Sequence, residues 1–226
     1  MKEQLIEYLS RYITDNKREK IDEVLNNRTR FLTVIVEDIY QPQNASAVVR
    51  TCDCFGIQDL HIIENRNRYH LNPDVTLGSS KWVDLIKHNQ PGANNTQLCI
   101  NKLQASGYKI YATTPHKNDV NLEELPLDRK TALIFGNEKE GLSKDALEMA
   151  DGYVKIPMIG FTESLNISVS AAISIHHLIH KLRQSGMDWK LSEEEKEEIK
   201  LRWIKNILKR GNLLEREFFN RTEGCI

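Results

Sequence analysis

Three polar segments, each next to an apolar run, carry groups that could bind a ligand. They span residues 44–51, 135–143 and 156–166. In the third segment, Pro157 and Gly160 exclude a regular helix before Ser164, so backbone N–H and C=O groups remain there to hydrogen-bond a purine or a carboxylate. The simpler alternative is an ordinary helix cap, since Asn166 is a good N-cap for the apolar helix that follows.

The first segment combines Asn44, which can cap a helix, with Arg50 six residues later. That spacing predicts that Arg50 lies nearly two turns further along the helix, roughly on the same side. The alternative to a ligand-binding role for Arg50 is a surface residue or a member of an ion pair.

The second segment carries Gly136 and Gly141, with Ser143 directly before a helix. This pattern predicts a tight turn followed by an N-cap. The order Gly-x-x-x-x-Gly-Lys-Ser/Thr of a P-loop is absent, and so is the Gly-x-Gly-x-x-Gly of dinucleotide-binding folds. ATP and NAD are therefore not favoured as ligands.

The cysteines and histidines show no ligand spacing, and we expect no metal site. Cys52 and Cys54 are too close for an easy disulfide and lack the second pair of a zinc site. His176 and His180 share a helix face, but a metal there would need further ligands, so packing or solvent contact explains them better. We expect reduced thiols at all four cysteines, the other two being Cys99 and Cys225.

Hydrophobic periodicity predicts the scaffold that must position these segments. Strands are predicted over residues 31–36, 60–63, 108–112, 131–135 and 152–156, and helices over residues 2–13, 17–27, 45–55, 96–106, 143–150 and 167–182. Residues 64–80 are expected to form a loop, and residues 82–86 a short apolar piece. Alternating strands and helices favour a parallel sheet with helices on both faces. Ligands of such sheets bind at the carboxyl ends of the strands.

Bulk composition indicates one domain with helical extensions. The chain has 226 residues, 40% of them hydrophobic and 28% charged, with a net charge of -1. Because no apolar run approaches the roughly 20 residues of a membrane span and the N-terminus lacks a signal peptide, we expect a cytoplasmic protein. From residue 192 onward the composition is that of a charged helix.

Positive charge is concentrated near both ends of the chain. Residues 200–221 carry seven basic residues against two glutamates, and a second basic group precedes the first strand: Lys17, Arg18, Lys20, Arg28 and Arg30. Such stripes could neutralise phosphates, with binding that weakens as salt rises. The alternative for each is a solvated helix face.

Together and in this order, the three segments resemble motifs of the SPOUT superfamily of RNA methyltransferases, and within it of the TrmH-type tRNA guanosine 2′-O-methyltransferases. The similar stretches are Asn44-x-x-Ala47-x-x-Arg50-Thr51-Cys52-Asp53, Ile134-Phe135-Gly136-x-Glu138-Lys139-x-Gly141, and Ile156-Pro157-Met158 with Ser164-Leu165-Asn166-x-Ser168-Val169. Ser80-Lys81-Trp82-Val83 is similar as well. The resemblance extends to about Arg183.

The resemblance implies an α/β fold, a parallel sheet flanked by helices, whose C-terminal part is threaded as a deep trefoil knot, an exception to the rule against knots. It also implies a homodimer with sites at the subunit interface. The predicted division is a helical N-terminal extension (1–30), a SPOUT methyltransferase domain (31–185) and a charged helical C-terminal extension (186–226).

S-adenosylmethionine, bound in a bent form, is the implied cofactor. Its implied contacts are Ala112, Thr113, Thr114, Phe135, Gly136, Asn137, Ile156, Met158, Ser164 and Leu165. The residues that match the catalytic set are Asn44, Arg50, Glu138, Ser164 and Asn166. RNA contacts are expected from Lys17, Arg18, Lys20, Arg50 and Lys81. Glu140 and the stretch Phe161-Thr162-Glu163 depart from the family pattern and add negative charge near the RNA site.

The implied activity is 2′-O-methylation of a ribose in tRNA, with the D-loop guanosine at position 18 as the expected target. The family proposal makes Arg50 the general base, but guanidinium groups stay protonated in proteins. We therefore expect Arg50 to clamp a phosphate and stabilise the developing alkoxide, with Asn44 orienting it. Glu138 and Asn166 would position the ribose and loops, and Ser164 would bind cofactor or relay the proton. The alternatives are a ribosomal-RNA 2′-O-methyltransferase and a non-catalytic RNA-binding protein.

Overall fold

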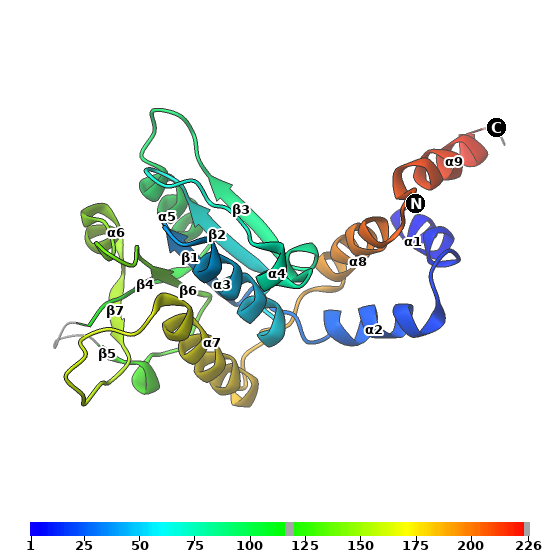
Figure 1. Cartoon of the computed structure of the whole chain (residues 1–226). Helices are drawn as coiled ribbons and strands as arrows, with labels where there is room; N and C mark the ends of the chain where they lie inside the picture. Colours follow the sequence, from blue (N-terminus) through cyan, green and yellow to red (C-terminus); the bar gives the residue numbers. More distant parts are fainter. Residues whose placement is uncertain (116–119, 224–226) are drawn as a thin grey trace. The chain divides into compact units, whose positions relative to one another are not determined.

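The computed structural model describes residues 1–115 and 120–223, and these form two compact units. One unit is Thr29–Trp189, and the other combines Met1–Arg28 with Lys190–Ile226. The two ends of the chain thus contribute to the same unit (Figure 1). The predicted three-part division at residues 30 and 185 stays a prediction.

The larger unit is built on a parallel sheet, which confirms the predicted α/β class. Its strands within the described residues are β1 (Leu32–Glu37), β2 (Asp59–Ile63), β3 (Asp84–His88), β4 (Lys109–Thr113), β5 (Val120–Asn121), β6 (Thr131–Phe135) and β7 (Gly152–Lys155). Their order is β3-β2-β1-β6-β4-β7-β5, with neighbours parallel. Every residue of β1, β2 and β6 is buried, because helices cover both faces.

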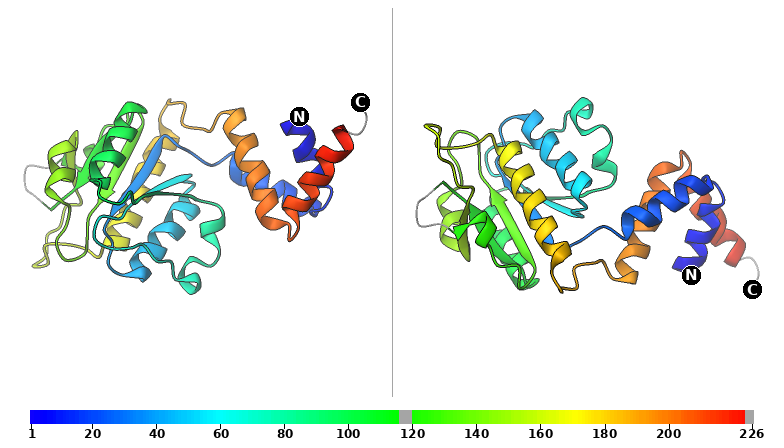
Figure 2. Two further views of the ribbon diagram at one scale, coloured as in Figure 1. Left: turned by 90° about the horizontal axis from the view of Figure 1, so that it is seen from above. Right: turned by 90° about the horizontal axis from the view of Figure 1, so that it is seen from below.

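Alternate side chains of β1 enter different cores, one on each face of the sheet. Val34 and Val36 pack with residues of α3 (Pro42–Phe55) and α7 (Ile167–Gln184). Ile35 packs with residues of α5 (Asn95–Ala105) and α6 (Lys144–Met149). Figure 2 shows the sheet between these helices from two sides.

Predicted helix ends are confirmed where capping chemistry is local. Asn166 caps α7 by accepting a hydrogen bond from the Ser168 amide at 2.8 Å. Ser143 caps α6 through the amide of Ala146. Gly56 ends α3 in the left-handed conformation, φ 83°.

Several predicted elements need correction. Helix α3 begins at Pro42, before the predicted residue 45, because proline is suited to the first helical turn, where its missing N–H has no helical partner. Its N-cap is Gln41, so Asn44 lies inside the helix and does not cap it as expected. The predicted loop 64–80 contains the short helix α4 (Pro73–Thr76) and the start of the 3-10 turn η1 (Ser79–Lys81). The apolar piece at 82–86 is strand β3, which runs two residues further, and β5 and the turn η2 (Leu122–Glu124) were not predicted.

The smaller unit is helical. Its helices among the described residues are α1 (Lys2–Ser10), α2 (Asp15–Leu25), α8 (Glu193–Ile207) and α9 (Gly211–Glu223). Trp203 of α8 is 1% exposed, with the Arg28 guanidinium 5.2 Å from its ring centre, and Lys200 pairs with Asp22 at 2.5 Å. The two predicted terminal extensions therefore pack against each other. Among residues 1–115 and 120–223, no helix combines the length and apolarity needed to cross a membrane.

Candidate functional site

A cavity of about 630 Å³ lies at the carboxyl ends of β4, β6 and β7. Its walls are residues 113–115, 135–142, 154–156 and 164–167, together with Leu122, Leu147, Met158, Ser170 and Ser174. Parallel sheets bind ligands at this edge, since several strands deliver their following loops to one place.

The cavity brings together nine of the ten residues predicted to hold a cofactor. These nine are Thr113, Thr114, Phe135, Gly136, Asn137, Ile156, Met158, Ser164 and Leu165. Ala112, the tenth, is fully buried in β4, one residue before the wall begins. Three loops that are separate in the sequence thus form one surface, and cofactor binding by these residues stays a prediction.

The wall formed by residues 136–141 is a tight turn, as its glycines predict. Asn137 and Gly141 exchange two backbone hydrogen bonds of 2.9 Å, and Gly141 has φ 72°. A Cβ on Gly136 would come within 2.2 Å of the backbone of Gly141, so only glycine fits there. The Asn137 side-chain amide also donates to the Asp38 carbonyl, at 2.6 Å. The turn is therefore fixed against β6 and the end of β1.

Glu138 lies in this turn and holds the start of α3. Its carboxylate accepts hydrogen bonds from the backbone amides of Tyr40 (3.0 Å) and Gln41 (3.2 Å) and from the side-chain amide of Asn44 (2.8 Å). Partial burial alone would raise its pKa, but the hydrogen bonds from Asn44 and these amides outweigh it, and the pKa is lowered below the ordinary value. Glu138 is therefore an ionised carboxylate whose oxygens are used as acceptors.

Asn166 continues the same hydrogen-bonded chain into the third segment. Its side-chain amide donates to the side-chain oxygen Oδ1 of Asn44 at 3.2 Å, while its own Oδ1 accepts from the Ser168 amide and hydroxyl. Asn44, 7% exposed, therefore joins Glu138 to Asn166. We call Glu138, Asn44 and Asn166 the three-segment network. Asn166 is both a helix cap and a member of this network.

Arg50 does not join the network. Its side chain is exposed on α3, and within the part of the chain that the structure describes it makes no hydrogen bond or ion pair. Six residues rotate a helix by about 600°, which leaves Asn44 and Arg50 about 120° apart. The expectation that they share a side is corrected here, and Asn44 contacts Glu138 and Asn166 instead of orienting Arg50.

The other predicted RNA contacts divide between the units. Lys81 is exposed on η1 of the larger unit. Lys17, Arg18 and Lys20 belong to α2 of the helical unit, where Arg18 pairs with Asp15 and Lys20 pairs with Glu23. Ion pairs reduce the charge that these two side chains offer to a phosphate.

Comparison with known proteins shows the family of this chain. Residues 31–176 match the model of the SpoU rRNA Methylase family. The chain belongs to this family. A relative named tRNA (guanosine(18)-2'-O)-methyltransferase, from Borreliella burgdorferi, is 46% identical over 207 residues, which cover 92% of this chain and 93% of the relative.

Two solved structures are similar in fold to this SpoU-family chain. A structure titled A. aeolicus TrmH/SpoU tRNA modifying enzyme superposes with a TM-score of 0.76 at 33% identity, covering 86% of this chain and 98% of that one. The SpoU methyltransferase AviRb from Streptomyces viridochromogenes, in complex with the cofactor AdoMet, shares the fold with a TM-score of 0.60. That similarity is at 22% identity and covers 72% of this chain and 62% of AviRb.

Sequence reasoning missed two acidic residues that position the site of this SpoU-family chain. Glu37, 2% exposed, accepts hydrogen bonds from the Thr96 hydroxyl and from the amide and hydroxyl of Ser143. It joins the starts of α5 and α6 to β1.

Asp38 follows in the left-handed region, at φ 49°. Its carboxylate accepts from the backbone amides of residues 65, 66 and 67, and its carbonyl accepts from Asn137. Glu37 and Asp38 both directly follow the strand predicted over residues 31–36. Charged residues at the carboxyl end of a buried parallel strand are a signal in the sequence from which they could have been predicted.

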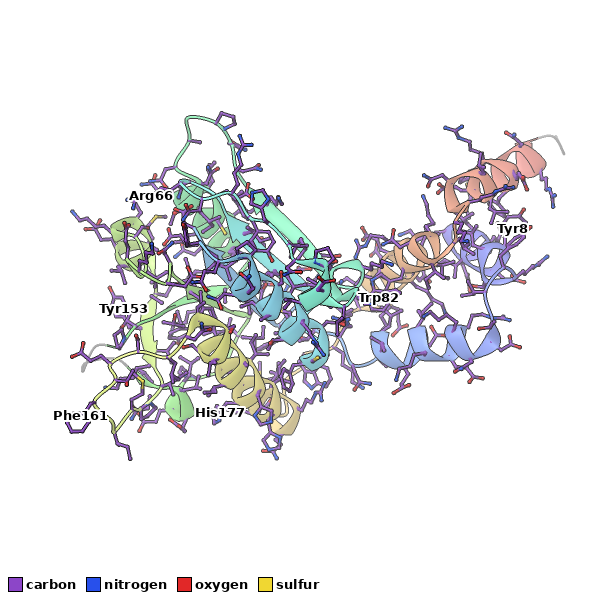
Figure 3. The ribbon with its side chains drawn as sticks, viewed as in Figure 1. Tyr8, Arg66, Trp82, Tyr153, Phe161 and His177 are labelled. Atoms are coloured by element: carbon purple, nitrogen blue, oxygen red, sulfur yellow. The ribbon has the colours of Figure 1, made fainter. Side chains whose placement is uncertain are left out.

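Two features of the cavity rim bear on the departures from the family pattern. Glu140 forms an ion pair with Arg66, and the positive charge of Arg66 partly neutralises the negative charge that Glu140 adds. The loop before α7 exposes Ile159 and Phe161 completely, and Figure 3 shows Phe161 projecting from that loop.

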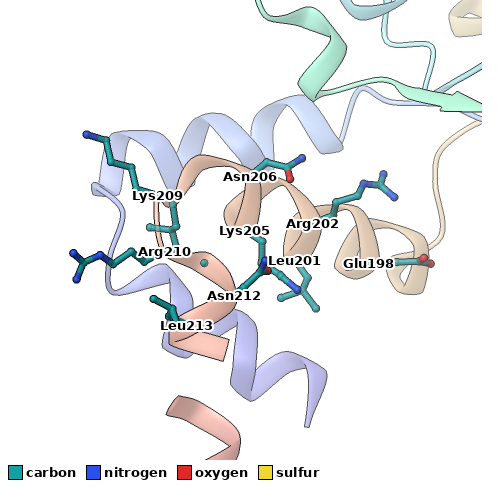
Figure 4. Close-up of a pocket in the computed structure, with 11 residues that line it drawn as sticks. Glu198, Leu201, Arg202, Lys205, Asn206, Lys209, Arg210, Asn212 and Leu213 are labelled. Carbon is teal, nitrogen blue, oxygen red and sulfur yellow. The ribbon is translucent and has the colours of Figure 1, made fainter. Parts of the chain in front are cut away.

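The helical unit has a basic pocket of its own. Figure 4 shows it between α8 and the start of α9, with a volume of about 520 Å³. Its basic lining residues are Arg202, Lys205, Lys209 and Arg210. Lys205 pairs with Glu215 at 2.6 Å, whereas Lys209 and Arg210 are exposed.

Proposed function

We propose that this chain transfers a methyl group from S-adenosylmethionine to the 2′-hydroxyl of the guanosine at position 18 of tRNA. The observation that carries the proposal is the three-segment network at a cavity on the carboxyl edge of the sheet, in a SpoU-family chain. The 46% identity over nearly the whole length to a tRNA (guanosine(18)-2'-O)-methyltransferase supports this substrate.

The cavity suits S-adenosylmethionine in size and lining. Its apolar residues, Phe135, Ile156, Met158 and Leu165, could hold the adenine and the methionine chain, and the turn 136–141 supplies backbone groups. When bound, the cofactor supplies an electrophilic methyl group on its sulfonium. The AdoMet complex of AviRb supports this choice of cofactor.

The residues of this chain would position the reacting groups. Glu138 is a weak base, because its oxygens are occupied by the donors that lower its pKa, and it would act by holding Asn44 and the start of α3. Asn166 would hold the third loop against Asn44. The 2′-oxygen gains the methyl group and loses its proton, which Ser164, on the cavity wall, would pass toward solvent.

Arg50 would clamp the target phosphate and stabilise the developing negative charge electrostatically. Its exposure on α3 supports a role toward a molecule outside this chain. We propose a homodimer in which such exposed groups complete the site, and the exposed Ile159 and Phe161 support this assembly. The trefoil knot is proposed from the family resemblance, supported by the insertion of β7 between β4 and β5. The cytoplasmic location stays a prediction.

The test is incubation of the purified protein with labelled S-adenosylmethionine and unmodified total tRNA or ribosomal RNA, followed by nucleoside mass spectrometry. We expect label as 2′-O-methylguanosine in tRNA, and none in a transcript with adenosine at position 18. Label in ribosomal RNA alone would favour the second candidate, a ribosomal-RNA methyltransferase, which the family description favours. RNA binding without transfer would indicate a non-catalytic protein.

A further inference from the structure

Three potential metal ligands meet between the sheet and α5, and none of them lines the cavity. His61 Nδ1 lies 3.1 Å from His88 Nε2. The ligand atoms of His61, His88 and Cys99 all lie within 4.8 Å of one another. His61 and Cys99 are buried and His88 is half-buried.

The fold explains why residues so far apart in the sequence meet. In the parallel pairing of β2 with β3, Ile63 lies opposite His88, so His61 is the diagonal neighbour of His88 on the same face. Ile63 and Cys99 belong to the core under α5, which places that face beneath the helix. His61, His88 and Cys99 do not have the sequence spacing of a known metal-binding motif, so the sequence alone does not predict this arrangement.

The donor set fits a borderline cation. Imidazole nitrogen and thiolate sulfur are the ligands that Zn²⁺ prefers, at distances of about 2.0–2.1 Å and about 2.3 Å. At tetrahedral angles, such ligand atoms stand roughly 3.4–3.6 Å apart. The two nitrogens already approach this separation, and the sulfur needs a shift of up to roughly 1.3 Å. Water would supply the fourth ligand.

The surroundings contribute opposing charges. Burial lowers the pKa of His61 to about 3, with His88 and Lys102 adding to the effect, so its ring is neutral. A bound ion replaces the hydrogen bond between His61 Nδ1 and His88 Nε2, and the proton of each ring then sits on its other nitrogen. Burial raises the pKa of the Cys99 thiol to about 12, and bound metal would displace the thiol proton to solvent. Lys102 opposes a cation at this place, whereas the negative charge of Glu37 favours it.

We propose that His61, His88 and Cys99 form a binding site for a divalent cation of the Zn²⁺ type. The ion links β2 and the edge strand β3 to α5, and its binding energy stabilises the fold. This inference is independent of the proposed methyl transfer. The alternative is a hydrogen-bonded histidine pair beside an inert buried thiol.

The test is a Co²⁺ titration of the reduced full-length protein, because tetrahedral Co²⁺ with a thiolate ligand gives sulfur charge-transfer absorption and strong visible bands. The parent carries Cys54→Ser and Cys225→Ser, and also His176→Gln and His180→Gln, which removes the stacked histidine pair on α7. We expect one Co²⁺ per chain with both signals, and displacement by Zn²⁺. Zn²⁺ should also raise the melting temperature.

Two variants assign the signal. Cys99→Ser should lose the charge-transfer band, and His88→Gln should weaken Co²⁺ binding about tenfold or more. Circular dichroism of the metal-free proteins checks that each variant is folded. If Cys99→Ser does not fold, Cys99→Ala replaces it, and the His88→Gln result stands independently. A parent without the sulfur band, or an equal band in folded Cys99→Ser, overturns the proposal.

Discussion

The candidate cavity and the basic pocket of the helical unit are both polar, but they are built in different ways. The three-segment network joins residues 94 and 122 positions apart through hydrogen bonds among the Glu138 carboxylate, the buried side chain of Asn44 and the exposed side chain of Asn166. The basic pocket is made by a single stretch, residues 198–213, with exposed cations. The first arrangement fixes geometry, and the second supplies charge. Substitutions should therefore have large, specific effects in the cavity and small, salt-dependent effects in the basic pocket.

The largest effect is expected from Glu138→Ala. The change leaves the amides of Tyr40 and Gln41 and the Asn44 side chain without their acceptor, so the network loosens. We expect the single-turnover methylation rate to fall about 100- to 1,000-fold, as when a preorganised polar group is removed. Glu140→Gln in the same turn is the matched control, since it removes an equal charge from an exposed ion pair, and it should change the rate less than about threefold. Equal losses in both would contradict the network.

Glu37→Gln tests whether the strand end also fixes geometry. The amide replaces one acceptor oxygen by a donor facing Ser143 or Thr96, in a site that is 2% exposed. We expect the free energy of unfolding to fall by about 2–3 kcal/mol, measured by urea denaturation. Glu148→Gln on the exposed side of α6 should change it by less than about 0.5 kcal/mol. An unchanged midpoint for Glu37→Gln would remove Glu37 from the set of positioning residues.

Arg50 lies in the same sequence segment as Asn44 of the network. Its side chain is nevertheless exposed, like those of Lys209 and Arg210 in the basic pocket. Arg50→Ala should lower the single-turnover rate about 100-fold if the guanidinium stabilises developing charge. Arg50→Lys should recover little of that loss, because an ammonium cannot make the bidentate contact. Recovery of most of the rate by lysine would show that a simple positive charge suffices.

The smallest effect is expected from Lys209→Ala combined with Arg210→Ala. Loss of two exposed cations should weaken tRNA binding about tenfold and reduce the slope of log affinity against log salt by about 1–2. Lys196→Ala on α8, whose side chain pairs with Glu193, is the control and should leave the slope nearly unchanged. A fall in the turnover rate with unchanged tRNA affinity would contradict a purely electrostatic role.

The sequence by itself determined the parallel sheet, the three loops at its carboxyl edge and the caps of α6 and α7. These follow from interactions within a few residues: β-branched runs form buried strands, and Ser143 and Asn166 bond to amides two or three positions on. The turn 136–141 was predictable in the same way, because its glycines meet a local steric demand.

Only the tertiary structure decided which of these groups meet. Strand order and helix packing place Glu138 and Asn166 against Asn44, and bring His61, His88 and Cys99 under α5. It also packs the two ends of the chain into one helical unit. Contacts between residues separated by tens to hundreds of positions depend on how strands are ordered and helices pack, and local periodicity carries no record of that order.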